Sequence, residues 1–125
     1  MALVLDAGAL AAIDRRARAP GPLLKLTGTG PDGVLTSAAA VAQVWRNGSR
    51  QANLARLLQG IEILPLSAAS ARRVGELLAV SRTRDIVDAH IALLVHDGDV
   101  VLTSDPGDIG RLIGARGVAA AVVKV

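Results

Sequence analysis

Two aspartates of this sequence lie where predicted β-strands end. Asp6 follows the apolar segment 2–5, and Asp105 follows the segment 100–103. Open parallel sheets bind ligands at the carboxyl ends of their strands, so both carboxylates are candidates for a site. Each one alone also has a simpler explanation, because an aspartate in front of a helix caps its first backbone N–H groups, and Asp108 would complete a capping box with Asp105.

A third aspartate, Asp88, is harder to explain as a surface residue. It falls in the segment 85–96, whose pattern predicts a helix. At helical spacing Asp88 shares a row with three apolar residues, Ile91, Ala92 and Val95. Its carboxylate is therefore expected along an apolar face, where an aspartate needs a partner. Asp85 lies one turn earlier on the same side, where stabilisation by the helix dipole is its simplest role.

Carboxylates that converge on one point need a counter-charge. Two of them about 4 Å apart repel by roughly 4 kcal/mol at an effective dielectric constant of about 20. A shared proton or an arginine relieves this repulsion, and a hard divalent cation relieves it best, because Mg²⁺ and Mn²⁺ prefer oxygen ligands. Zinc chemistry has no support, since the chain has no cysteine and no HExxH motif, and His90 and His96 are too far apart to share a helix face. We expect both histidines at the surface.

The composition fits one small basic domain, whose charge either attracts a polyanion or, as in many such domains, serves no nucleic-acid binding. The 125 residues are 51% hydrophobic, which predicts a single domain over residues 1–125. No apolar run is long enough to cross a membrane, and the absence of cysteine fits a reducing cytoplasm. The net charge is +3 and comes mainly from arginine, which suits phosphate contact. Trp45 is the one aromatic residue, so RNA would be recognised through its backbone rather than by stacking of bases.

The elements that must position these residues alternate between strands and helices. Five β-like segments are predicted at residues 2–5, 34–36, 61–64, 100–103 and 120–123. Helices are predicted at 8–18, 38–45, 49–58, 68–79, 85–96 and from 106 onward, with Ser37 and Ser67 as N-caps and a loop over 23–33. This alternation predicts an α/β fold with three layers, α/β/α, around a central parallel sheet of four or five strands.

Three short motifs in this order resemble those of PIN domains, in particular VapC-type toxins. They are V-L-D-A-G-A-L at the start, D-I-V-D-A-H-I-A in the middle and V-L-T-S-D-P-G-D-I near the end. The resemblance implies that Asp6, Asp88 and Asp105 are the catalytic, metal-binding acids, with Asp108 as a further ligand. Thr103 and Ser104 match hydroxyl positions that orient a carboxylate or a metal-bound water, and the other reading of these two is strand termination and helix capping.

One position departs from the family pattern. PIN domains place a glutamate in the helix after the second strand, where this sequence has Gln43. An amide offers one neutral oxygen and no charge, so either three or four aspartates suffice or the site is weakened. Gln43, Arg46, Asn47 and Arg50 are expected to form one helical face, which either contacts the RNA backbone or is simply solvated. Trp45 is expected in the core or in a dimer interface.

The resemblance implies a metal-dependent endoribonuclease that hydrolyses RNA, leaves a 5′-phosphate, forms a homodimer and is inhibited by an antitoxin protein. The alternative is a PIN module that binds RNA or a partner protein without cleavage, as Gln43 suggests. A phosphoacceptor receiver domain is a poor fit. Such domains need adjacent acids after the first strand, where Asp6 stands alone.

Overall fold

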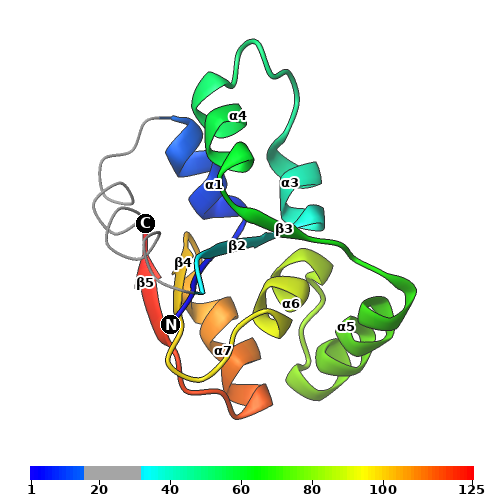
Figure 1. Ribbon diagram of the computed structural model, residues 1–125. Helices are drawn as coiled ribbons and strands as arrows, with labels where there is room; N and C mark the ends of the chain where they lie inside the picture. The colour runs from blue at the N-terminus through cyan, green and yellow to red at the C-terminus, as the bar shows by residue number, and fades with distance from the viewer. Residues whose placement is uncertain (16–31) are drawn as a thin grey trace.

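The computed structural model describes residues 1–15 and 32–125. The end of the expected first helix, residues 16–18, and most of the expected loop over 23–33 lie outside the described residues. Figure 1 shows the arrangement of the elements.

A sheet of five parallel strands forms the centre of the molecule (Figure 1), as the alternation of elements predicted. The strand order is β3-β2-β1-β4-β5. The strands are β1 (Leu3–Leu5), β2 (Val34–Ser37), β3 (Glu62–Leu64), β4 (Val100–Thr103) and β5 (Ala121–Lys124). Each lies within one residue of its predicted position at either end. Because all strands are parallel, their carboxyl ends lie along one edge of the sheet.

Burial along the strands explains this order. Leu3, Val4 and Leu5 of the central strand are fully buried, which requires cover on both faces of the sheet. In the outer strands β3 and β5 most residues are exposed. The most apolar strand therefore lies at the centre, where most of its surface is buried. Each Å² of apolar surface removed from water stabilises the fold by roughly 25 cal/mol.

Six helices occur among the described residues. They are α1 (Ala7–Asp14), α3 (Ala38–Val44), α4 (Ala52–Gln59), α5 (Ala68–Ser81), α6 (Ile86–Leu93) and α7 (Pro106–Arg116). Helix α1 packs against α3 and α4, and the last three helices pack against one another. Figure 1 shows the two groups on opposite sides of the sheet, which gives the three layers. None of these helices has the length and apolar character that a membrane span requires.

The helix starts follow the predicted capping residues. Ser37 accepts a hydrogen bond from the backbone N–H of Ala39, and Ser67 forms a capping box with Ser70. Pro106 occupies the first turn of α7, as expected for a proline.

Several helix predictions were wrong at their ends. The helix expected over residues 8–18 ends at Asp14, with Arg15 as its C-cap, and the helix expected over residues 68–79 continues to Ser81. The helix expected over residues 49–58 begins at Ala52, because the side-chain oxygen of Gln51 accepts hydrogen bonds from the N–H groups of Arg46 and Asn47 and shapes a turn there. Residues 94–96 are not part of α6, whose last turn tightens when Leu94 donates to the carbonyl of Ile91.

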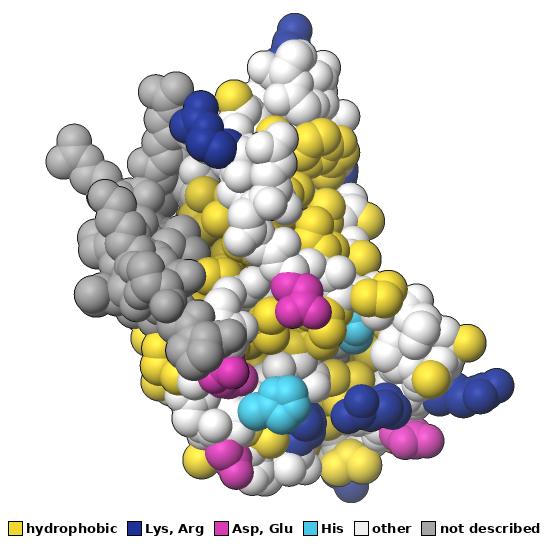
Figure 2. All heavy atoms as spheres, viewed as in Figure 1, with side chains coloured by type: hydrophobic (Ala, Val, Ile, Leu, Met, Phe, Trp, Pro, Cys, Tyr) yellow, Lys and Arg dark blue, Asp and Glu magenta, His cyan; other side chains and the backbone are white. Residues whose placement is uncertain are grey.

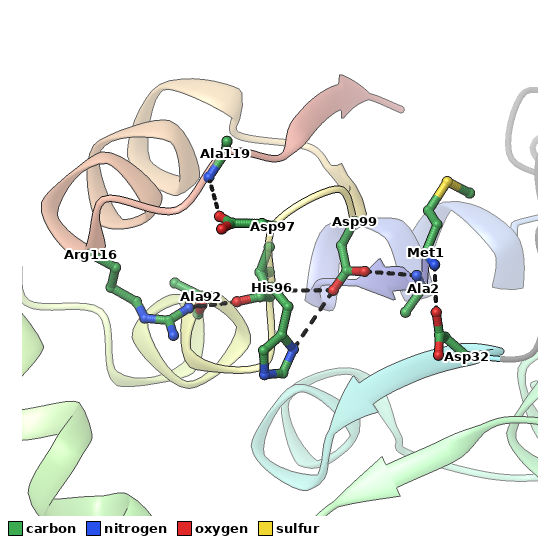
Figure 3. A network of polar contacts seen from close by, with 10 residues as sticks. Met1, Ala2, Asp32, Ala92, His96, Asp97, Asp99, Arg116 and Ala119 are labelled. Carbon is green, nitrogen blue, oxygen red and sulfur yellow. Dashed lines mark hydrogen bonds and ion pairs between the residues drawn. The ribbon is translucent and has the colours of Figure 1, made fainter.

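The chain after α6 is fixed by polar contacts, shown in Figure 3. Arg116 donates to the carbonyl oxygens of Ala92 and Val95, at 2.6 and 2.7 Å. The buried carboxylate of Asp99 accepts from the N–H groups of Ala2 and His96, at 2.7 and 2.9 Å. These contacts hold the C-terminal end of α6, while its N-terminal end carries Asp88.

Candidate active site

The carboxyl ends of the adjacent strands β1 and β4 bring Asp6 and Asp105 to the same edge of the sheet. Leu5 pairs with Leu102, and the N–H of Asp6 donates to the carbonyl of Leu102 at 3.2 Å. From β1 the chain continues to β2 and β3 on one side, and from β4 it continues to β5 on the other side. Open α/β sheets form ligand crevices between two such strands.

Asp6 is a buried carboxylate that its neighbours hold in place. Its side chain is the N-cap of α1 and accepts a hydrogen bond from the N–H of Ala9 at 2.8 Å. Burial raises the pKa of Asp6, and a hydrogen bond from the hydroxyl group of Thr103 acts in the opposite direction. The capping role considered from the sequence is therefore present, and it fixes the direction of the carboxylate.

Thr103 connects the two strand ends. Besides its contact with Asp6, its hydroxyl oxygen accepts a hydrogen bond from the N–H of Asp105 at 2.8 Å. Asp105 is exposed, and as the N-cap of α7 it accepts from the N–H of Asp108 at 3.2 Å. Ser104 is exposed and lies against Gly8 of α1. One buried hydroxyl group thus couples the positions of two candidate acids.

The acids of α6 lie within electrostatic range of this edge. Asp85 is the N-cap of α6 and accepts from the N–H of Asp88 at 2.9 Å. The half-buried Asp88 has a pKa raised to about 7, first by desolvation and then by the negative charges of Asp85, Asp6, Asp105 and Asp108. Five carboxyl groups from three segments of the chain therefore share one region of negative potential.

The donor chemistry of this cluster suits Mg²⁺ or Mn²⁺, because every candidate ligand is a carboxylate oxygen. The negative charges of its neighbours, which add to desolvation in raising the pKa of Asp88, also favour a cation. Yet within residues 1–15 and 32–125 no three acidic or histidine side chains lie close enough together to hold a metal ion between them. The acids are gathered in one place, but they are not arranged as a preformed coordination shell.

The expected basic face beside this site is not formed. Helix α3 ends at Val44, so Arg46, Asn47 and Arg50 lie in the following turn and do not continue the face of Gln43. The guanidinium group of Arg46 instead donates to the carbonyl oxygens of Ala42 and Trp45, where it satisfies the end of α3. Gln43 is exposed and forms no hydrogen bond with another residue that the structure describes.

Trp45 is not a core residue, because 38% of its surface is exposed. It follows α3 as the C-cap residue and lies against Gly48. Its second expected role, in a dimer interface, stays a prediction.

One histidine was misplaced by the sequence reading. His96 is exposed as expected, but His90 is only 2% exposed. Its Nδ1 atom forms a hydrogen bond with the hydroxyl group of Ser37, the N-cap of α3. The spacing carried a signal for this burial, since His90 is followed at helical distance by the apolar residues Leu93 and Leu94. This contact joins α6 to the carboxyl end of β2.

A cavity of about 370 Å³ lies at the opposite edge of the sheet and does not include the predicted site. Its lining includes Asp32, Glu62, Asp97 and Asp99. The carboxylate of Asp99 is already occupied by two backbone N–H groups, and Asp32 pairs with the amino group of Met1. The candidate site is therefore the carboxyl edge, where burial and then the negative charges of four other acids raise the pKa of Asp88.

Comparison with known proteins supports the fold. No protein-family model and no curated protein sequence matches this chain. A similar solved structure is a chain in the crystal structure of VapBC2 from Rickettsia felis bound to a DNA fragment from their promoter. The TM-score is 0.71 over 98% of this chain and 99% of that chain, with 16% sequence identity. At this identity the likeness shows a shared fold, in agreement with the PIN-like architecture expected from the motifs.

Proposed function

We propose that this chain is a metal-dependent endoribonuclease of the PIN/VapC toxin type, which hydrolyses phosphodiester bonds in RNA. The observation that carries the proposal is the gathering of carboxyl groups at the carboxyl edge of the sheet, where the charges of Asp85, Asp6, Asp105 and Asp108 add to desolvation in raising the pKa of Asp88. The fold likeness to a chain of a VapBC2 complex adds support. The excess of arginine suits a polyanionic substrate.

Asp6, Asp88, Asp105 and Asp108 are the residues that would hold Mg²⁺ or Mn²⁺. Such an ion would lower the pKa of a water molecule and offset the charge that develops on the phosphate. Asp6 is buried and held by its cap and by Thr103, whereas Asp105, the N-cap of α7, and Asp108 are exposed to solvent. In this division of roles, Asp6 sets the place of the site and the exposed acids complete it.

The family resemblance extends the proposal to partners and products. It implies a 5′-phosphate on the product, a homodimer, and inhibition by a cognate antitoxin protein. The similar solved structure is of VapBC2 bound to a DNA fragment from their promoter, and the resemblance to VapC-type toxins supports an antitoxin partner for a chain of this fold. These points depend on the resemblance and need their own tests.

A second candidate function is a PIN module that binds RNA or a partner protein without cleaving it. Two observations favour it. Gln43 replaces the family glutamate, and no three of the described acids are close enough together to hold a metal ion. The two candidates differ in whether Mn²⁺ binds at all.

The test is cleavage of a labelled single-stranded RNA with Mn²⁺, with Mg²⁺ and with EDTA. Wild type is expected to cleave only with a divalent ion, and Asp6→Asn and Asp88→Asn are expected to lose that activity. Glu76→Gln is the matched control, because Glu76 is an exposed acid on α5 with no hydrogen bond among the described residues. Equal cleavage by all four proteins would exclude this site. Calorimetry that detects no Mn²⁺ binding at millimolar concentration would favour the non-cleaving module.

A further inference from the structure

The turn between α5 and α6 carries two exposed arginines directly before the acidic cluster. Arg82 ends α5, and Arg84 immediately precedes Asp85, the N-cap of α6. Neither arginine forms an ion pair with a described residue. Their positive charge is thus available beside a site whose own charge is negative.

The backbone of Arg82 is held in an unfavourable conformation. With φ 57 and ψ 42 it is left-handed, and it is the one non-glycine residue with a positive φ among those described. The end of α7 offers an internal comparison, because Gly117 occupies the same conformation there with φ 67 and ψ 27. Glycine is preferred at such helix ends, since a β-carbon crowds the neighbouring carbonyl oxygen. An arginine at this position destabilises the helix end, so its presence there is not explained by stability.

Hydrogen bonds fix the turn around this residue. The N–H groups of Arg82 and Thr83 both donate to the carbonyl oxygen of Leu78. The hydroxyl groups of the buried Ser81 and of Thr83 are 2.8 Å apart and share a hydrogen bond. The two arginines therefore project from a defined backbone rather than from a loose loop.

The negative charge of the acidic cluster suggests a role for Arg82 and Arg84 in binding phosphate. A phosphate that approaches the carboxylates is repelled by the negative charges of Asp85, Asp88 and their neighbours. Guanidinium groups next to the cluster offset this repulsion and bind phosphate oxygens in a bidentate manner. Arg46, the residue expected to do so from the sequence, is committed to the end of α3. Figure 2 also shows Lys and Arg side chains gathered over α5 and α7.

We propose that Arg82 and Arg84 form the phosphate-binding rim of the active site and contact the RNA backbone beside the phosphodiester that is cleaved. This inference rests on the proposed ribonuclease function and assigns the part of the chain that receives the substrate.

The experiment measures binding of the full chain to a fluorescein-labelled single-stranded RNA of twelve nucleotides and mixed sequence. Fluorescence anisotropy is followed in EDTA from 0.05 to about 0.3 M salt, the range over which phosphate contacts weaken measurably. The variants are Arg82→Gly, Arg84→Gln and the double variant. Arg56→Gln is the matched control, because Arg56 is an exposed arginine on α4, outside the α5–α6 turn.

Each substitution is expected to weaken binding roughly tenfold at low salt and to reduce the slope of log affinity against log salt by about 0.7. The double variant should lose about twice that slope, and Arg56→Gln should lose little. Arg82→Gly should at the same time raise Tm by about 2 to 4 °C, because glycine relieves the left-handed conformation. A variant that is more stable but binds RNA less well cannot owe the loss to misfolding.

Three results would overturn the inference: no binding of RNA by wild type, an unchanged salt slope in the double variant, or an equal loss in Arg56→Gln. Cleavage separates it from the proposed function. If wild type cleaves, Asp88→Asn does not, and the double arginine variant cleaves and binds like wild type, the function stands and the rim is wrong. If the arginine variants lose binding but wild type never cleaves with Mn²⁺, the two arginines bind the RNA backbone, and the nuclease with its active-site rim is wrong.

Discussion

Gly8 and Ser104 approach so closely that there is no room for a side chain on the glycine. A β-carbon on Gly8 would lie 1.9 Å from the hydroxyl oxygen of Ser104 and 2.5 Å from its β-carbon. Both distances are far inside van der Waals contact. The first turn of α1 therefore rests directly on the chain that leaves β4, and this contact brings the segments that carry Asp6 and Asp105 together.

Gly8→Ala is expected to destabilise the fold by about 1 to 3 kcal/mol, because the added methyl group forces α1 away from Ser104. Thermal unfolding measures this loss. Gly75→Ala is the matched control, since Gly75 is helical and a β-carbon there meets nothing within 4 Å. The control should be neutral or stabilising. The double variant Gly8→Ala/Ser104→Gly removes both clashing atoms and should recover most of the loss, and a failure to recover would contradict the contact.

The sequence predicted this architecture well because buried parallel strands consist of continuous apolar residues. Leu3, Val4 and Leu5 point alternately to the two faces of the sheet, and all three are apolar and buried. A short continuous apolar run of this kind is typical of a central parallel strand. It also predicted that Asp6 and Asp105 lie at the same edge of the sheet, because the carboxyl ends of adjacent parallel strands must share an edge. The identity of strand neighbours, such as β1 with β4, is a long-range property that no local pattern contains.

Details that depend on side-chain hydrogen bonds were missed. The turn after α3 is set by Gln51, which reaches back to the N–H groups of Arg46 and Asn47. The burial of His90 depends on Ser37, which is distant in the sequence. Such contacts form only when the fold is complete, so helical spacing alone placed Arg46 and Arg50 wrongly on one face with Gln43.

The raised pKa of Asp88 predicts how stability depends on pH in the metal-free protein. Its pKa is about 7 in the folded chain against an ordinary value of 3.8, so between these values the folded state binds more protons than the unfolded state. Stability therefore falls as pH rises from about 4 to 7. Asp88→Asn removes this contribution and should be more stable than wild type at pH 8 by about 1 kcal/mol, a reduced figure because the carboxyl group is partly screened by water.

Urea denaturation of both proteins at pH 4.5 and at pH 8, in EDTA, checks this prediction. The two stabilities should be similar at the acidic pH, where Asp88 is protonated, and diverge at the alkaline pH. A constant difference between wild type and variant at both values would contradict a raised pKa. Addition of Mn²⁺ at pH 8 should stabilise wild type more than Asp88→Asn, because binding to the folded state alone shifts the equilibrium.

The contact between Ser37 and His90 predicts that replacing the N-cap residue of α3 lowers the stability of the fold more than the loss of an ordinary N-cap does. Ser37→Ala removes the N-cap of α3 and also leaves the Nδ1 atom of a buried imidazole without a partner. The expected loss is about 2 to 4 kcal/mol, the sum of a cap and an unsatisfied buried polar group. Ser67→Ala, which removes the exposed N-cap of α5, should cost only about 1 kcal/mol. Denaturation curves of the two variants decide the matter, and similar losses would show that His90 does not depend on Ser37.

Gln43 offers a way to ask whether the missing charge limits the site. It lies on α3, which packs against α6, the helix that carries Asp88. Gln43→Glu adds a carboxylate at the position where PIN domains have one, and affinity for hard cations rises with the charge of the ligand set. We expect Mn²⁺ affinity to increase by about tenfold and RNA cleavage to rise with it, as measured by calorimetry and by single-turnover cleavage.

The matched control is Gln59→Glu, which adds the same charge at the exposed end of α4. Its Mn²⁺ affinity and cleavage rate should equal those of wild type, because a charge at the end of α4 adds no ligand to the cluster at the carboxyl edge. If Gln43→Glu also leaves both quantities unchanged, the aspartates form the complete ligand set and the missing glutamate does not limit the chain. If Gln43→Glu raises Mn²⁺ affinity but still does not cleave RNA, weak metal binding is not the reason for the missing hydrolysis. The non-cleaving module is then the better description.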